Sequence, residues 1–278
     1  MSGFLDDMAR ASAARAAAAR RREPIGELER RAQRCAPPPP LRLSADGFDV
    51  IAEIKLRSPA AGILGLASDD WLDRAAAYAR AGAAAVSVLT EPTRFDGCLE
   101  HLSRAAAALA PLGVPTMRKD FLVDPYQILE ARACGAGGAL LILRMLSRAQ
   151  TVEMLDAAAA RQLFVLLEAF DGDDLDLAAD LAAARNVRPE AILIGLNCRD
   201  LQTLAVMPQR FGELAARLPR RFPAVAESGV ATPAEAAETR RLGYRLALIG
   251  TALMASADPT ALLVDILRAA RTVPIQNS

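Results

Sequence analysis

The chain has 278 residues, of which 53% are hydrophobic, so it can bury a large core and general disorder is excluded. Its 33 basic and 33 acidic residues balance, which gives no global attraction to nucleic acid or to an anionic membrane, and no apolar run reaches the ~20 residues of a spanning helix. His101 is the only histidine, which excludes a metal site built from several histidines and leaves acid–base chemistry to Lys, Glu and Asp. The four cysteines lack metal-ligand spacing, and we expect them to be reduced thiols in a cytoplasmic protein.

Residues 1–34 are rich in Ala and Arg, a pattern that predicts one or two surface helices with a break near Glu23 and Pro24. An organelle transit peptide is also rich in Arg, but the interspersed acidic residues argue against one. They argue equally against a nucleic-acid-binding role for this segment. The prolines at 37–40 stop the helix, so we expect an N-terminal helical extension with a Pro-rich linker over 1–40 and a main domain over 41–278.

After the linker, short apolar runs alternate with longer amphipathic segments. Strands are expected over 50–55, 84–89, 114–118, 139–143, 163–168, 191–196, 223–227 and 246–250. Helices are expected over 69–82, 98–110, 125–135, 148–161, 172–186, 208–218, 233–243 and 259–271. Continuous apolar strands indicate a parallel sheet covered on both faces. Eight such strand–helix units predict an α/β protein with a single (β/α)8 TIM barrel. An open doubly wound sheet would need a G-x-G-x-x-G turn after its first strand, and there is none.

Local signals support these helix boundaries. Helix starts are indicated by residues typical of the cap and of the first turn, namely Ser68, Asp124-Pro125, Ser147, Thr232-Pro233 and Asp258-Pro259. Helix ends are indicated by Gly82, Gly135 and Gly243, where a left-handed residue is expected.

Polar residues recur at the C-terminal ends of the predicted strands, where barrel active sites form. The charged and amide side chains there are Glu53, Lys55, Glu91, Arg118, Lys119, Asp120, Arg144, Glu168, Asn197, Arg199 and Glu227. Each one alone has an ordinary explanation as a polar group at a barrel mouth, and Glu53 with Lys55 could be a structural ion pair on one face of a strand. Their recurrence favours a ring of carboxylates and cations that shift one another's pKa and act as acids and bases near neutral pH.

Small residues follow the last two predicted strands. Ser228-Gly229 and Gly250-Thr251 place free backbone N–H groups at the position where many barrels bind phosphate. Ordinary turn glycines would explain each pair separately. The two pairs together, on adjacent strands, favour a phosphate-binding site.

Several motifs together resemble the indole-3-glycerol-phosphate synthase family of tryptophan biosynthesis. They are I-A-E-I-K-x-x-S-P from residue 51, S-V-L-T-E-P-x-x-F-x-G from residue 87, R-K-D-F-x-x-D-P-Y-Q from residue 118, G-x-N-x-R-D-L-x-T from residue 195 and A-E-S-G from residue 226. A glutamate also ends the fifth predicted strand. The resemblance runs from about Val50 to Leu263, and it implies ring closure of 1-(o-carboxyphenylamino)-1-deoxyribulose 5-phosphate with loss of carbon dioxide and water, without a metal or an organic cofactor.

The resemblance also implies roles for individual residues. Lys119 would be the general acid that protonates the ketose oxygen, and Glu168 its acid–base partner in the dehydration. Glu53 and Lys55 would flank the reacting centre, with Lys55 also reaching the phosphate. Asn197 and Glu227 would hold sugar hydroxyls and orient the lysines. A neighbouring cation is expected to lower the pKa of the acidic lysine toward neutral pH.

The remaining implied roles concern binding. Arg199, with Ser58, would pair with the substrate carboxylate, which suits a guanidinium group. Phe95 and Leu196 would pack against the aromatic ring. The phosphate would be held by Ser228, Gly229, Gly250 and Thr251.

The chain departs from the family pattern at two positions. Ala60 stands where a second serine is usual, and Phe170 places a large apolar ring near the predicted mouth, where it would alter substrate fit. Two alternatives therefore stay open, a specialised paralogue in another indole pathway and a catalytically silent phosphate-binding barrel. We expect a monomer whose partner is a phosphorylated small molecule, with no nucleic acid and no membrane.

Overall fold

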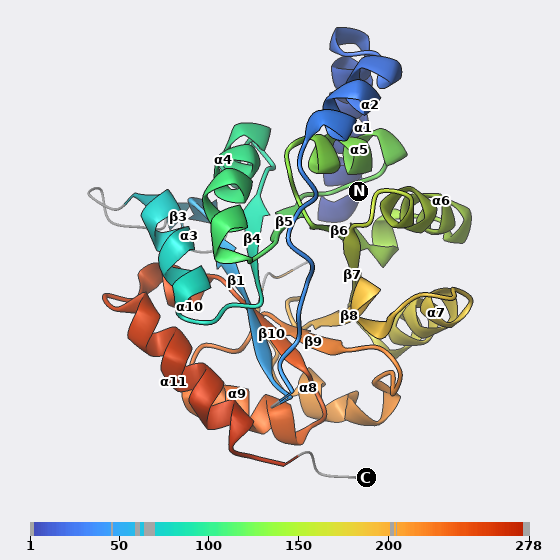
Figure 1. Cartoon of the computed structure of the whole chain (residues 1–278). Helices are drawn as coiled ribbons and strands as arrows, with labels where there is room; N and C mark the ends of the chain where they lie inside the picture. The colour runs from blue at the N-terminus through green and yellow to red at the C-terminus, as the bar shows by residue number, and fades with distance from the viewer. Residues whose placement is uncertain are drawn as a thin grey trace.

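The computed structural model describes residues 3–45, 47–58, 62–63, 70–200, 203 and 205–274. Parallel strands form a closed barrel in the order β1-β10-β9-β8-β7-β6-β5-β4 (Figure 1). Their bounds are β1 (Asp49–Ile54), β4 (Ala85–Leu89), β5 (Thr116–Lys119), β6 (Gly138–Ile142), β7 (Phe164–Ala169), β8 (Ile192–Asn197), β9 (Ala224–Glu227) and β10 (Leu246–Ile249). The register of β1 against β10 pairs Val50 with Ala247 and closes the barrel. The predicted (β/α)8 barrel is confirmed, and every strand lies within two residues of its expected bounds.

Helices surround the barrel on its outer side (Figure 1). Those that connect the strands are α3 (Trp71–Arg80), α4 (Leu99–Leu109), α5 (Pro125–Ala133), α6 (Arg148–Ala159), α7 (Gly172–Ala183), α8 (Arg210–Glu213), α9 (Pro233–Arg241) and α11 (Pro259–Arg271). A short helix, α10 (Thr251–Ala255), follows β10 and was not expected. The helix predicted over 208–218 was too long, because α8 ends at Glu213 and is followed only by a 3-10 turn at Ala215–Arg217. Gly212, a poor helix former, lies within this short helix.

Most of the predicted helix caps are present. The side chains of Asp124, Ser147, Thr232 and Asp258 each accept a hydrogen bond from a backbone N–H in the first turn. The cap predicted at Ser68 lies outside the described residues, and Asp70 caps α3 through the N–H of Leu72. Gly82, Gly135 and Gly243 have φ of 99°, 82° and 101° and reverse the chain at the helix ends.

Alternation along β1 explains how the barrel positions its polar groups. All six residues of β1 are buried. Val50 and Ala52 pack in the layer between strands and helices, whereas Ile51 belongs to a second cluster inside the barrel. Since side chains at i and i+2 share a face, Glu53 lies directly above Ile51 at the C-terminal end of the barrel.

The N-terminal extension packs against one side of this end. Helix α1 (Phe4–Arg22) breaks at Glu23 and Pro24, as predicted, and α2 (Ile25–Arg34) follows. Leu28 and Ala32 of α2 pack on α5, as part of a small buried cluster that is separate from the barrel core. The linker then runs from α2 to the start of β1 at the opposite end of the barrel (Figure 1).

Two further findings bear on the expectations from composition. All four cysteines are free thiols. None of the helices within the described residues combines the length and the apolar character needed to cross a bilayer.

Candidate active site

A cavity of about 500 Å³ opens at the C-terminal end of the barrel. Most of the residues predicted for the site line it, namely Glu53, Lys55, Phe95, Lys119, Glu168, Asn197, Arg199, Glu227, Ser228, Gly229, Gly250 and Thr251. They come from β1, β5, β7, β8 and β9 and from the segments that follow β1, β4, β8, β9 and β10, so the barrel brings together residues spread over almost 200 positions of the chain.

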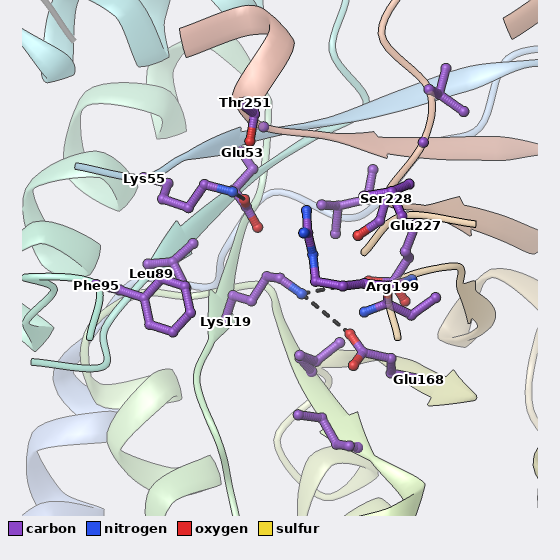
Figure 2. Close-up of a pocket in the computed structure, with 18 of the residues that line it drawn as sticks. Glu53, Lys55, Leu89, Phe95, Lys119, Glu168, Arg199, Glu227, Ser228 and Thr251 are labelled. Carbon is purple, nitrogen blue, oxygen red and sulfur yellow. Dashed lines mark hydrogen bonds and ion pairs between the residues drawn. The ribbon is translucent and has the colours of Figure 1, made fainter. Parts of the chain in front are cut away.

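Lys119 lies at the centre of the cavity (Figure 2). Its Nζ is 3.3 Å from Oε2 of Glu168 and 3.5 Å from Oε2 of Glu227. The side chains of the two glutamates are only 4% and 2% exposed. Lys119 and Glu227 end β5 and β9, and Glu168 is the last residue but one of β7, so the strand ends themselves fix the geometry of this triad.

Glu53 and Lys55 form a second pair across the cavity (Figure 2). Lys55 donates a hydrogen bond from Nζ to Oε1 of Glu53 at 2.8 Å, as the i, i+2 spacing predicted. The side chain of Lys55 is 12% exposed, so this ammonium borders the cavity and remains open to a ligand.

Burial and the neighbouring charges act in opposite directions on the pKa of Lys119. Burial alone would lower the pKa of Lys119, but Glu168, Glu227 and Glu53 outweigh it and raise that pKa, so the side chain is an ammonium at neutral pH. The expectation that a neighbouring cation lowers the pKa of Lys119 is therefore wrong for the unliganded protein, because the charged groups nearest to this lysine are carboxyl groups.

The carboxyl groups respond in opposite directions. Burial, followed by repulsion from Glu168, raises the pKa of Glu227 well above its usual range against the attraction of Lys119. For Glu53, burial is the largest single effect and raises the pKa, but Lys55, Lys119 and Arg199 together outweigh it and lower that pKa. The site thus holds a carboxyl group with a raised pKa beside an ammonium, together with a carboxyl group whose pKa is lowered, and such pairs of differently shifted groups suit general acid–base catalysis.

The apolar wall of the cavity includes residues that the sequence did not single out. Leu89 and Phe121 lie beside Phe95, and the rings of Phe95 and Phe121 have centroids 6.2 Å apart. From the extension, Phe4 and Leu5 of α1 complete this wall, with the Phe4 ring 5.8 Å from Phe121 in an edge-to-face arrangement. Phe121 follows Lys119-Asp120 in a motif that drew attention to the site, whereas no local pattern connects α1 to it.

Polar residues hold α1 against the barrel. Arg15 donates from Nη2 to Oδ1 of Asp120 at 2.6 Å, and Gln127 donates from Nε2 to Oγ of Ser12 at 2.9 Å. Asp120 is buried and also accepts from Oγ1 of Thr90 at 2.9 Å. The extension is therefore docked next to the strand that carries Lys119.

The opposite side of the cavity is formed by the loops after β9 and β10. Ser228 and Gly229 have φ of 60° and 105°, so the chain turns sharply there. Thr251 begins α10 (Figure 2). The close approach of Glu53 also explains why position 250 is a glycine, since a Cβ built there would be 3.1 Å from Cδ of Glu53.

Three of the predicted binding residues, Leu196, Ser58 and Arg199, have different outcomes in the structure. The prediction that Leu196 contacts the substrate ring is wrong, because Leu196 is fully buried in the layer between strands and helices. It alternates with Asn197, so the two adjacent side chains point to opposite faces of β8. The side chain of Ser58 lies outside the described part of the structure. Arg199 lines the cavity, and its backbone N–H donates to Oδ1 of Asn197 at 2.9 Å.

The two departures from the family pattern have different outcomes. Ala60 lies outside the described residues. Phe170 was expected to alter the fit of the substrate, but it does not line the cavity. Its ring is 3% exposed and packs in the cluster inside the barrel, and the guanidinium of Arg144 lies 5.1 Å from the ring centroid. Arg144 itself pairs with Asp171 and Asp174 and takes no part in the site.

No group of three or more His, Cys, Asp or Glu side chains suited to a metal ion occurs among the described residues. Strongly shifted ionisable groups that gather in one cavity are characteristic of catalytic sites. Fold and site together define a (β/α)8-barrel enzyme with a cluster of lysine and glutamate side chains in the cavity at the C-terminal end of its strands.

Comparison with known proteins identifies the family. The family model described as "Indole-3-glycerol phosphate synthase" matches residues 5–266, so the chain belongs to the indole-3-glycerol phosphate synthase family. The indole-3-glycerol phosphate synthase of Azospirillum brasilense is 42% identical over 223 residues, which are 80% of each chain. That of Mycobacterium avium is 39% identical over 259 residues, which are 92% of this chain and 91% of the relative.

Solved structures of other enzymes share the fold alone. Thiamine phosphate pyrophosphorylase from Pyrococcus furiosus superposes with a TM-score of 0.57 at 12% identity, covering 82% of this chain and 98% of its own. A 3-hexulose-6-phosphate synthase superposes with the same TM-score of 0.57 at 18% identity, covering 80% of this chain and 99% of its own.

Proposed function

We propose that the chain converts 1-(o-carboxyphenylamino)-1-deoxyribulose 5-phosphate to indole-3-glycerol phosphate. One carbon–carbon bond forms between the ring carbon that bears the carboxylate and the ketose carbonyl carbon. The carboxylate then leaves as carbon dioxide, and the hydroxyl derived from the ketone leaves as water. The net reaction is therefore a decarboxylation combined with a dehydration, as expected of a carboxy-lyase in tryptophan biosynthesis.

The observation that carries this proposal is the position of Lys119 between two unlike walls of one cavity. Figure 2 shows Leu89 and Phe95 to the left of Lys119, Ser228 to its upper right, and Thr251 above it beyond Glu53. An aromatic ring suits the first wall, and a phosphate suits the backbone N–H groups of the second. The atoms that react in the substrate lie between its ring and its phosphate, which places them at the ammonium of Lys119.

The proton transfers follow from the charges in the cavity. Lys119 donates a proton to the ketose oxygen while the new bond forms. In the dehydration, the leaving hydroxyl takes a proton from the carboxyl group of Glu227 and departs as water, while Glu168 accepts the proton that the substrate loses. Because Lys119 is held by carboxylates in the unliganded protein, its acidity must rise when the substrate displaces these contacts.

Binding is assigned to the groups around this centre. Arg199 pairs with the substrate carboxylate until it is lost as carbon dioxide, and Asn197 orients sugar hydroxyls. Lys55 contributes charge to the phosphate, together with the backbone at Ser228, Gly229, Gly250 and Thr251. Phe95 packs against the aromatic ring, together with Phe4 and Phe121. We infer that the protein acts as a monomer in the cytoplasm, and that residues 1–40 serve the barrel as an extension that completes the cavity wall.

The test is the appearance of indole fluorescence after the purified chain is mixed with the proposed substrate in the presence of a chelator. Turnover that releases one carbon dioxide for each indole formed supports the proposal. Tight substrate binding without turnover would point to a silent barrel. Failure of both would mean that the substrate is a different phosphorylated molecule.

A further inference from the structure

Gly195 of β8 lies against a carboxyl group of the site without lining the cavity. It is two residues before Asn197, so it faces the inside of the barrel. A Cβ built on Gly195 would overlap with Oε1 of Glu227, and it would be 3.1 Å from Cδ of Glu227 and 3.0 Å from Cδ1 of Leu166. The carboxyl group of Glu227 therefore occupies the space that any other residue at position 195 would fill.

A side chain at position 195 would have to displace the carboxyl group of Glu227, because this buried group lies directly against it. Its side chain is 2% exposed, and its Oε1 has no hydrogen-bond partner among the described residues. Its Oε2 is 3.5 Å from Nζ of Lys119. A methyl group below Oε1 would push the carboxyl group toward the cavity and change its position relative to Lys119 and Glu168.

A similar arrangement recurs at the next pair of strands, β10 and β1, beside β9. Gly250 of the turn after β10 lies against Glu53 of β1, with a built Cβ 3.1 Å from Cδ and 3.2 Å from Cβ of Glu53. Two carboxyl groups of the site thus each lie against a glycine of a neighbouring strand or of the turn that follows it. Gly250 lines the cavity and is assigned to the phosphate, whereas Gly195 does not line it, and the atoms nearest to a Cβ built there belong to Glu227 and Leu166.

We propose that Gly195 is a positioning residue for the reaction, because its lack of a side chain leaves the space that holds the carboxyl group of Glu227 within reach of Lys119. This inference rests on the proposed function for its catalytic readout, although the geometry it describes does not depend on turnover. The role is distinct from chain flexibility, since Gly195 lies in the middle of a regular strand that pairs with both neighbours.

The kinetic test combines Gly195→Ala with Glu227→Asp. Gly195→Ala should lower kcat about 100-fold with KM within about threefold of the parent, the scale expected when a catalytic group is displaced by about 1 Å. An Asp at position 227 is one methylene shorter and withdraws from position 195. In the Glu227→Asp background, Gly195→Ala should therefore cost less than about threefold in kcat.

A merely structural role would give a different pattern. If Gly195 served only the stability of the barrel, its substitution would lower kcat by the same factor in both backgrounds, and this result would overturn the inference. A rise in KM with kcat unchanged would overturn it as well, because it would show an effect on binding. Gly26→Ala in α2, where a Cβ has only the end of Arg30 within 4 Å, is the matched control and should leave kcat and the pH profile unchanged.

A second readout needs no turnover. The carboxyl carbon of Glu227 can be followed by 13C NMR and assigned by its loss in Glu227→Gln. In Gly195→Ala its titration midpoint should move toward that of an exposed glutamate, whereas an unchanged midpoint would contradict the proposal. If the parent protein shows no turnover, the proposed function fails while this measurement still decides the role of Gly195.

Discussion

The carboxyl group of Glu227 is buried, and it lies near the carboxyl group of Glu168 and the ammonium of Lys119. The loss of solvent and the repulsion from Glu168 together raise its pKa, so at pH values between the unfolded and the folded pKa the folded chain keeps a proton that the unfolded chain releases. A neutral carboxyl group can donate a hydrogen bond to a sugar hydroxyl and pass a proton to Glu168. Such retention of a proton costs stability, and this cost can be measured.

The stability of Glu227→Gln should depend on pH in a defined direction. A carboxyl pKa that is raised by folding makes the parent lose stability as pH rises from the unfolded value of about 4.3 toward the folded value, at up to about 1.4 kcal/mol per pH unit. Gln does not ionise, so urea unfolding should find the variant more stable than the parent at pH 8 and little different at pH 4. A difference that stays constant from pH 4 to pH 8 would show that Glu227 is an ordinary carboxylate.

Substitution of Leu196, the neighbour of Asn197, tests whether this residue packs in the core or binds the substrate. Because Leu196 is fully buried between strands and helices, Leu196→Ala should cost about 2–5 kcal/mol in the free energy of unfolding, as core truncations do. KM should stay within about twofold of the parent, since the side chain does not face the cavity. A large rise in KM in protein that is still folded would return Leu196 to the binding site.

Helix α1 is the element that links the extension to the cavity. It adds Phe4 and Leu5 to the cavity wall and is tied to Asp120 by Arg15. Sequence analysis predicted one or two N-terminal helices with a break near Pro24, because proline stops a helix for local reasons. Their docking depends on contacts more than 100 residues apart in the chain, such as Gln127 with Ser12, and no periodicity within α1 reports such contacts.

Phe4→Ala tests this link. The variant loses an edge-to-face contact with Phe121, worth about 0.5–1.5 kcal/mol beyond the buried area. KM should therefore rise about three- to tenfold with a smaller change in kcat. Ile25→Ala, which truncates a 50% exposed side chain at the start of α2, is the control and should change neither constant. Equal effects of the two substitutions would indicate that the extension acts only through overall stability.

At the scale of the whole molecule, the barrel could be read from the sequence almost completely. Its strands are apolar runs bounded by turn residues, and parallel pairing follows when both faces are buried. The residues of the site were found because they end these strands. What the sequence did not report was the direction of side chains that resemblance alone assigned, as for Leu196, and the contribution of remote elements such as α1.

The exposed surface also bears on the assembly. Only Ile25, Leu112 and Val206 are exposed large apolar residues within the described part of the chain, and they lie far apart in the sequence. Since obligate dimers bury broad apolar surfaces, we expect light scattering to give a mass near that of one chain, 29.5 kDa. A mass of twice this value at micromolar concentration would contradict the proposed monomer.

The measurement that tests the account most directly compares the parent with Lys119→Met and Lys119→Arg in the indole-formation assay. Met keeps the length of the side chain without an acid, whereas Arg keeps the charge but does not release a proton at neutral pH. We predict that kcat falls by at least about 100-fold in both variants, the scale of a lost general acid, while the substrate still binds. Turnover by Lys119→Met within tenfold of the parent would contradict the central claim that Lys119 donates the proton that drives ring closure.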